Sequence, residues 1–189
     1  MTTQLHELIL KLQSGYTFRG PVLHDPAGDV RVAQSKDVTA VGVELESLPR
    51  VTGADYRTAP ETGMVVLLAA RGSFRAAALN CDEPIIASSS LYIMKPDESR
   101  LLPEYLAIHL NSPAAQAYFA QNSTGSSIKT LLIDTLRQLP VPDIPLDRQA
   151  LYVALHQNLM RQRAILERKT ALSQSILNQS LTAIEGAIK

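Results

Sequence analysis

Asp147 to Glu185 reads DRQALYVALHQNLMRQRAILERKTALSQSILNQSLTAIE, and neither glycine nor proline interrupts this stretch of the 189-residue chain. At 1.5 Å per residue, a helix of this length would run about 58 Å. The domain formed by the residues before it would be only about 30 Å across, by the scaling of compact chains. The sequence therefore predicts a domain over residues 1–145 and a long helix over residues 146–189. It also predicts that the helix packs on something outside its own domain.

Leucine and isoleucine recur along this helix mostly at steps of three, four and seven residues, the spacing of a coiled-coil seam. Gln162, Lys169 and Ser173 interrupt the pattern, so no single heptad register runs through it. The alternative is a helix that lies back across its own domain, where roughly three turns fit and ten do not. We predict a dimerisation helix whose contact residues are Leu155, Leu159, Leu166, Leu172, Ile176 and Leu181.

The residues before the long helix predict a β-rich domain with short helices, which makes the fold class of the whole chain α+β. Met64 to Ala70 (MVVLLAA) is apolar on both faces, as is typical of a central strand. Arg71 to Ser73 predicts a tight turn after it. Other runs rich in β-branched residues indicate strands at residues 29–34, 74–79 and 84–94, the last with a serine-rich middle.

Short helices are predicted at both ends of this β-rich region. Thr2 or Thr3 can cap a first helix, which ends at Gly15 and carries an apolar stripe at Leu5, Leu8, Ile9 and Leu12. Pro103 begins a second helix at the first-turn position that proline favours. The run Asn111-Ser112-Pro113 breaks or restarts this helix.

The segment between these helices and the long helix is predicted to be mostly extended. Residues 122–127 (NSTGSS) indicate a polar loop, and residues 128–136 indicate one more short helix. Residues 139–146 (LPVPDIPL) hold three prolines in eight positions, which predicts a stiff connector. Asp147 then stands where it can cap the long helix.

Composition excludes several classes of protein. The formal net charge is zero and 46% of the residues are apolar, so the chain can bury a core and its overall charge does not indicate a nucleic-acid binder. The single cysteine, Cys81, excludes an internal disulfide and a multi-cysteine zinc site, and we interpret it as a buried apolar residue. The sequence has no basic leader and no apolar run of 18 residues, so we expect a cytoplasmic protein without membrane contact.

No catalytic constellation is recognisable in the sequence. The glycine-rich dinucleotide and P-loop motifs and the G-x-S-x-G elbow are absent. Asn111-Ser112-Pro113-Ala114 lacks the aromatic residue with which an adenine-N6 methyltransferase would stack on a flipped base. The histidines have no metal-ligand spacing among them, and each is interpreted as a structural or surface histidine: His6, His24, His109 and His156. We therefore expect a non-catalytic protein without metal or cofactor.

The order of motifs from residue 101 onward resembles the specificity subunits of type I restriction-modification systems. The family's P-x-Y-L helix is matched at Pro103, Tyr105 and Leu106, and its polar glycine loop at residues 124–129. A Leu-Pro-x-Pro segment follows at residues 139–142, and Gln149 stands at the start of the long helix, as in the family. The likeness before residue 101 is weaker and involves residues 32–38, Gly63 to Leu67 and Arg71-Gly72, with Met64 where the family usually has an acid.

This resemblance implies a DNA target-recognition domain followed by a spacer helix. Full-length specificity subunits carry two such domains and two such helices, and the helices pack antiparallel. One domain and one helix imply a half-length form that pairs as a homodimer, or with a different half-subunit, and reads a palindromic, interrupted site in double-stranded DNA. The implied partners are the DNA methyltransferase subunit and the restriction subunit, in which the catalytic activity would reside.

Candidate DNA contacts follow from what DNA requires, namely cations and hydroxyls for phosphates and Arg, Lys, Asn or Gln for base edges. Arg71 and Arg75 flank a glycine turn in a stretch without acids, and a solvated hairpin is the alternative interpretation. Ser126, Ser127 and Lys129 lie in the stretch from Ser123 to Lys129, for which the alternative is a plain surface loop. Weaker candidates near predicted loop ends are Tyr16, Arg19, Gln34 and Lys36.

Other polar groups have two interpretations each. Ser88 to Ser90 are interpreted as the polar face of a strand. The basic residues of the long helix form a solvated face or contact DNA or a methyltransferase: Arg161, Arg163, Arg168 and Lys169. At the level of the whole chain, a DNA-specificity module stands against a protein-interaction adaptor whose helix pairs with a different chain. Salt-dependent duplex binding distinguishes these hypotheses because phosphate contacts weaken as salt rises.

Overall fold

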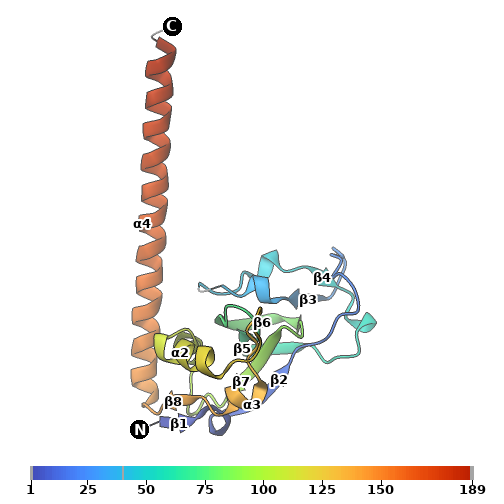
Figure 1. Cartoon of the computed structure of the whole chain (residues 1–189). Helices are drawn as coiled ribbons and strands as arrows, with labels where there is room; N and C mark the ends of the chain where they lie inside the picture. The colour runs from blue at the N-terminus through green and yellow to red at the C-terminus, as the bar shows by residue number, and fades with distance from the viewer. Residues whose placement is uncertain (1, 40, 188–189) are drawn as a thin grey trace. The chain divides into compact units, whose positions relative to one another are not determined.

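The computed structural model describes residues 2–39 and 41–187. The chain divides into two compact units, residues 1–151 and residues 152–189. The side chains of Asp55, Leu181 and residues 183–187 lie outside the described part. The predicted dimer contact of Leu181 therefore falls outside it as well. The first unit holds eight strands and three of the four α-helices of the described chain (Figure 1).

A six-stranded mixed sheet forms the body of the first unit, in the order β2-β7-β5-β6-β3-β4. Its central strand β5 is antiparallel to both of its neighbours, whereas β3 runs parallel to β6. The strands span Ile9–Ser14 (β2), Val30–Ala33 (β3), Arg50–Val51 (β4), Glu61–Ala69 (β5), Ala76–Ala87 (β6) and Leu91–Pro96 (β7). The prediction that Met64 to Ala70 forms a central strand is confirmed.

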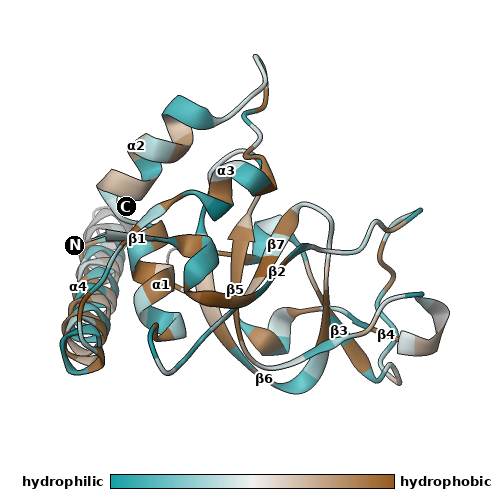
Figure 2. Cartoon of the chain, turned by 90° about the horizontal axis from the view of Figure 1, so that it is seen from below, coloured by the Kyte–Doolittle hydropathy of each residue, from teal (hydrophilic) through white to brown (hydrophobic). Residues whose placement is uncertain are grey.

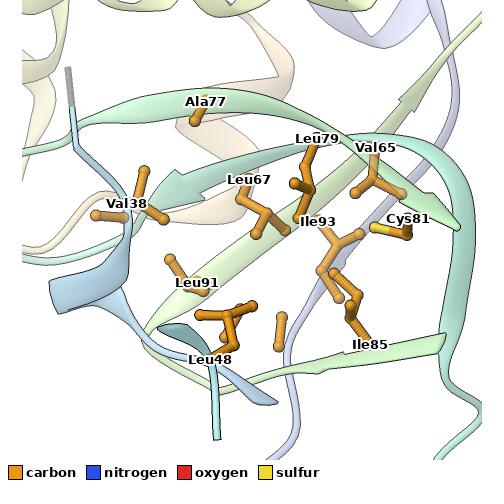
Figure 3. Packing of buried hydrophobic residues seen from close by; sticks show 13 residues of the cluster. Val38, Leu48, Val65, Leu67, Ala77, Leu79, Cys81, Ile85, Leu91 and Ile93 are labelled. Atoms are coloured by element: carbon orange, nitrogen blue, oxygen red, sulfur yellow. The ribbon is translucent and has the colours of Figure 1, made fainter. Parts of the chain in front are cut away.

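The sheet curls around one core. The first part of β6 pairs with β5 and its end pairs with β3, while the chain leaving β2 also joins the end of β6. Figure 3 shows these strands bending around inward side chains. The core that they enclose includes Val65, Leu67, Leu79, Cys81, Ile85, Leu91 and Ile93. Helix α1 packs against β5 and β6, and β5 is hydrophobic along most of its length (Figure 2).

The predicted N-terminal helix is wrong. Residues 2–14 instead form β1 (Thr2–Gln4), a 3-10 turn (Leu5–Glu7) and β2. β1 pairs with β8 (Pro140–Pro142), and β2 pairs with β7. Isolated helices of this length are marginal in water, so pairing with strands far along the chain prevails over a helical apolar pattern. The 3-10 turn still buries the first two leucines of that pattern, Leu5 and Leu8.

The strand predicted at residues 84–94 is also wrong as a single element. It comprises the end of β6 and the start of β7, and Ser88 to Ser90 form the turn between them. Leu91 N donates to Ser88 O at 2.8 Å and closes this turn. Serines are favoured in turns because their hydroxyls bond locally, and here Ser88 Oγ lies 2.7 Å from Ser90 Oγ.

Helices α1 (Pro103–Leu110) and α2 (Pro113–Asn122) confirm the predicted start at Pro103 and the break before Pro113. α3 is shorter than predicted and spans Ile133–Arg137, because the backbone of Lys129, Thr130 and Leu131 hydrogen-bonds to other segments. The proline-rich connector is extended as predicted and gains a partner strand, since β8 lies within it. Short 3-10 turns occupy Ser35–Asp37, Leu45–Ser47 and Gly53–Asp55.

The long helix α4 spans Leu146–Ala187, 42 residues, and would be about 63 Å long at 1.5 Å per residue. Asp147 lies inside its first turn, where an acid favours the helix dipole, and is not the cap that we predicted. The buried side chain of Gln149 fixes this turn to the first unit. Its Nε2 donates to Arg100 O and Ile144 O, and its Oε1 accepts from Leu102 N at 2.8 Å.

Large apolar side chains of α4 are exposed along the second unit, between 55% and 67% of their area. They include the predicted dimer contacts Leu155, Leu159, Leu166, Leu172 and Ile176. Hydrophobic and hydrophilic residues alternate along this helix (Figure 2). The predicted fold class is confirmed, namely α+β with a β-rich unit, short helices and one long C-terminal helix. Whether that helix forms a coiled coil stays a prediction.

Candidate nucleic-acid interface

The structure brings the predicted site residues from five loops to one end of the sheet. The polar loop meets the end of β5 through a bridge between Thr130 and Arg71, and Leu131 N donates to Ala70 O at 2.9 Å. Ala70 N in turn donates to Ser90 O at 2.8 Å. The polar loop, the turn after β5 and the serine turn before β7 are thus connected by backbone hydrogen bonds.

Two further loops continue this connection. Tyr16 follows β2, and its backbone lies on the serine turn, because Ser89 N donates to Tyr16 O at 2.8 Å. Ser88 N donates to Ala33 O at 2.8 Å, which places the residues after β3 beside the same turn. We call this end of the sheet the loop edge and define it as residues 16–22, 34–37, 70–75, 88–90 and 124–130.

Arg71 to Arg75, the arginine turn, has an unusual backbone. Gly72 has φ +79° and Phe74 has φ +46°, so a phenylalanine occupies the left-handed region. This conformation costs a non-glycine residue about 1–2 kcal/mol. Phe74 is only 6% exposed and packs edge to face on the buried ring of Phe119, with ring centroids 5.8 Å apart. Burying a phenylalanine contributes about 1.5–3 kcal/mol, which offsets the backbone cost.

The polar loop, residues 124–130, closes on itself. Thr124 N donates to Thr130 O at 2.9 Å, and Thr130 N donates back to Thr124 O at 2.7 Å. Gly125 has φ +99°, and a Cβ there would lie 2.4 Å from Ile128 O, so only glycine fits. Ser126, Ser127 and Lys129 are exposed on this closed loop, and Lys129 O accepts from Gly72 N of the arginine turn at 2.9 Å.

A hollow on the loop edge gathers the weaker candidates. Tyr16, Gln34 and Lys36 line it together with the serine turn. Beside it, Tyr16, Phe18 and Tyr56 form a cluster of edge-to-face rings with centroids 5.1–5.8 Å apart. Arg19 is exposed in the same loop as Tyr16, although it does not line the hollow. The hollow therefore combines aromatic walls with an amide, an ammonium group and hydroxyls.

The loop edge carries an excess of positive charge. Five cationic side chains lie on it, and none makes an ion pair within the described part of the chain: Arg19, Lys36, Arg71, Arg75 and Lys129. All five are exposed. The acid of these segments, Asp37, caps its own turn, since its Oδ2 accepts from Gln34 N at 2.9 Å.

Several cations elsewhere in the first unit are neutralised by neighbouring acids, whereas Arg57, Arg100 and Arg148 are exposed and make no ion pair within the described part of the chain. Buried Arg31 and half-buried Arg50 both bind Glu83, whose carboxyl pKa is lowered by hydrogen bonds from the two guanidinium groups. Lys11 and Lys95 both contact the buried carboxylate of Glu61. The five cations of the loop edge are distinguished by lying unpaired on loops that hydrogen bonds connect, and they are available for an anion.

Other titratable groups have structural surroundings. Burial raises the pKa of the Cys81 thiol to about 11, which keeps it protonated and unreactive. Burial also raises the pKa of Tyr92, whose hydroxyl donates to Leu131 O at 2.7 Å. Burial lowers the pKa of His109, whose Nε2 donates to Pro140 O at 2.9 Å. Among the described residues, no group of three or more His, Cys, Asp or Glu side chains could hold a metal ion.

Sequence reasoning missed the role of the serine turn, Ser88 to Ser90, which is the junction of the loop edge. Three successive small polar residues between two apolar runs are a turn signal that could have placed it. It also missed the contribution of α1 and α2, from which Asn111 and Gln116 bond to the backbone around Phe74. The sequence around Asn111 and Gln116 carries no signal for their contacts with residues 35 or more positions away.

Comparison with known proteins relates this geometry to solved structures. No family model matches the sequence, and no curated protein matches it. A chain from a structure of complex assembly and conformational transition of the type I R-M system is similar over 95% of this chain, with a TM-score of 0.69 and 18% identity. The chain has the fold of a type I specificity subunit.

Two further structures carry the same fold. The HsdS subunit from Thermoanaerobacter tengcongensis is similar over 89% of this chain, with a TM-score of 0.64 and 17% identity. The type I restriction-modification S subunit from M. genitalium is similar over 82%, with a TM-score of 0.55 and 14% identity. This chain spans 43%, 39% and 37% of the three neighbours' lengths. The resemblance predicted from the motifs is confirmed at the level of fold.

None of the described helices is long and apolar enough to cross a membrane. The apolar residues of α4 alternate with polar and charged ones, and Arg163 pairs with Glu167 at 3.1 Å on its surface. This HsdS-like chain therefore offers two exposed features in its two units, the cationic loop edge and the apolar side chains of α4.

Proposed function

We propose that this chain is a non-catalytic, sequence-specific DNA recognition module of a type I restriction-modification system and that the loop edge contacts the DNA. The observation that carries the proposal is the convergence of five unpaired cations on one end of the sheet in a chain with the HsdS fold. DNA presents a dense array of phosphates, and unpaired surface cations bind such an array by releasing its counterions.

The parts of the loop edge suit different parts of a duplex. The arginine turn and the polar loop offer two arginines, a lysine and hydroxyls, the groups that bind phosphate oxygens. Gln34 and Lys36 line the hollow, and Gln and Lys are side chains that pair with adenine and guanine edges in the major groove. We infer that the first group sets the position of the duplex and that the second group reads bases.

The exposed apolar side chains of α4 support dimerisation as the second half of the proposal. A solvated helix with leucine and isoleucine between 55% and 67% exposed along its length gains stability by covering them with another helix. A second copy of the chain would supply the same surface, and a twofold pair would present two identical loop edges to a palindromic, interrupted site.

Partner subunits complete the proposed assembly. One of the structural neighbours comes from a complex of the type I R-M system. By analogy, the chain would dock a methyltransferase subunit and a restriction subunit, which would supply all of the chemistry. The exposed basic residues of α4, Arg161, Arg163 and Arg168, are available for such contacts or remain solvated.

Selection from a pool of random duplexes tests DNA recognition. The full chain, mixed with the methyltransferase subunit of the same system, should enrich one interrupted sequence. Binding of the enriched duplex should weaken with salt, with log K falling by about 0.9 per log unit of salt for each phosphate contacted. Arg71→Ala with Lys129→Ala should lower that slope by about 2, because two phosphate contacts are lost.

Arg100→Ala with Arg148→Ala is the matched control, since it also removes two exposed positive charges, one from the turn that follows the opposite end of β7 and one from the first turn of α4. It should leave the slope unchanged. The alternative function is a protein-interaction adaptor, which the exposed apolar face of α4 would serve without DNA. A pool without enrichment, or binding that does not respond to salt, would support the adaptor and contradict the proposal.

A further inference from the structure

We infer that Phe74 is a positioning residue for DNA binding, which holds the arginine turn in one conformation and so presents Arg71 and Arg75 together. This inference rests on the proposed function and adds a mechanism to it. Phe74 has φ +46°, a backbone conformation that a phenylalanine rarely adopts. Such strain persists only where the surroundings fix it, and it concentrates at functional sites.

The first element that fixes the turn is the corner between α1 and α2. Phe74 inserts its ring against Phe119, which is fully buried. Gln116 Nε2 donates to Phe74 O at 3.1 Å and to Leu110 O at 2.8 Å, so one side chain joins the turn to the end of α1. The ring and the carbonyl of the same residue are therefore both held by α2.

Asn111 adds a second connection at the start of β6. Its Oδ1 accepts from Ala76 N at 3.0 Å, and its Nδ2 donates to Ala76 O at 2.7 Å and to Ala107 O at 2.9 Å. The amide side chain thus pairs with the backbone of one residue in both directions. Arg75 lies between the two residues, Phe74 and Ala76, that the helical corner holds.

The opposite side of the turn is held by the polar loop. Arg71 forms a bridge with Thr130, and Gly72 N donates to Lys129 O at 2.9 Å. The turn also closes on β5, since Ala69 N donates to Arg75 O at 2.8 Å. Arg71, Gly72, Ser73 and Arg75 are exposed, and Phe74 is the buried residue of the turn. Phe74 is a buried anchor with one exposed arginine before it and one after it. It reduces the conformational freedom that Arg71 and Arg75 would lose on binding phosphates.

The test is a mutant cycle on the full chain with the methyltransferase subunit and the enriched duplex. Phe74→Gly removes the ring and leaves the left-handed backbone accessible. It should weaken duplex binding by about tenfold, because two arginines on a flexible turn lose more conformational freedom on binding, whereas only Arg71→Ala with Arg75→Ala, which removes two charges, should lower the salt slope by about 2. The triple variant should show no further loss beyond that double variant. Phe74→Leu, which keeps an apolar anchor, should bind the duplex with the affinity of the unmodified chain.

The inference is overturned if Phe74→Gly binds the duplex as tightly as the unmodified chain, or if the triple variant binds more weakly than the arginine double variant. Circular dichroism establishes that Phe74→Gly is folded at the assay temperature. If it is not, Phe119→Leu takes its place under the same expectations, because it loosens the anchor and leaves the turn's own sequence intact. Failure of the unmodified chain to bind the duplex would contradict the proposed function, whereas a normal slope with an inert Phe74 would contradict this inference alone.

Discussion

The conformation of the loop edge depends on single residues with unusual backbone angles more than on ion pairs between side chains. Gly125 is required because a Cβ would meet Ile128 O at 2.4 Å, and Gly72 carries φ +79° in the arginine turn. Phe74 adopts the same backbone region without being glycine, and its buried ring explains why. These positions place exposed cations on a rigid support, which is what a surface that recognises a fixed duplex geometry needs.

His109 provides a residue-scale prediction about pH. Its pKa is lowered by burial, so the unfolded chain takes up a proton at a higher pH than the folded chain does. The contribution of neutral His109 to stability is therefore complete above its unfolded pKa near 6.5 and declines as the pH falls below that value. Urea unfolding at pH 7.5 and pH 5.5 should show lower stability at the acidic value.

The control for this prediction is His109→Gln, whose amide can still donate to Pro140 O and which does not titrate. The pH dependence of its unfolding free energy should be smaller than that of the unmodified chain. An NMR titration that places the His109 pKa at or above 6.5 would contradict the account, because burial would then not disfavour its charged form.

At the scale of elements, the sequence predicted structure where the signal was local. Met64 to Ala70 and the residues of α4 carry patterns long enough to specify their own conformation. The residues of β1 and β2 carry a helical pattern, yet the residues with which they pair in β8 and β7 lie 78 or more positions away and override it. The sequence predicted individual DNA-contact residues of the loop edge but not that they form one surface. Its five segments are far apart in the sequence and are connected by backbone hydrogen bonds that the sequence does not reveal.

α4 carries an element-scale prediction about self-association. The full chain should be a dimer by light scattering at micromolar concentration, because its exposed leucines need a cover. Leu159→Asp with Leu166→Asp should shift it to monomer, since a charge on the covered face is costly to bury. Gln157→Asp with Ala164→Asp places the same two charges, with the same spacing, at exposed positions outside the leucine pattern and should leave the dimer intact. A monomeric unmodified chain would contradict dimerisation through α4.

At the scale of the whole molecule, the two units separate two tasks. The first unit, residues 1–151, holds the core, the paired charges and the loop edge, and the second holds exposed apolar side chains on one helix. Gln149 and the connector strand β8 fix the first turn of α4 within the first unit. This division agrees with the HsdS fold and with the proposal that one unit reads DNA while the other pairs with a second copy.

Hydrogen exchange of the full chain with the methyltransferase subunit, with and without the enriched duplex, tests the proposed DNA contact most directly. The account predicts slower exchange of backbone amides at residues 71–75 and 124–130 when the duplex is bound. It predicts no change at residues 97–101, the turn that follows the other end of β7. A bound duplex that protects residues 97–101 and leaves the arginine turn and the polar loop unchanged would contradict it.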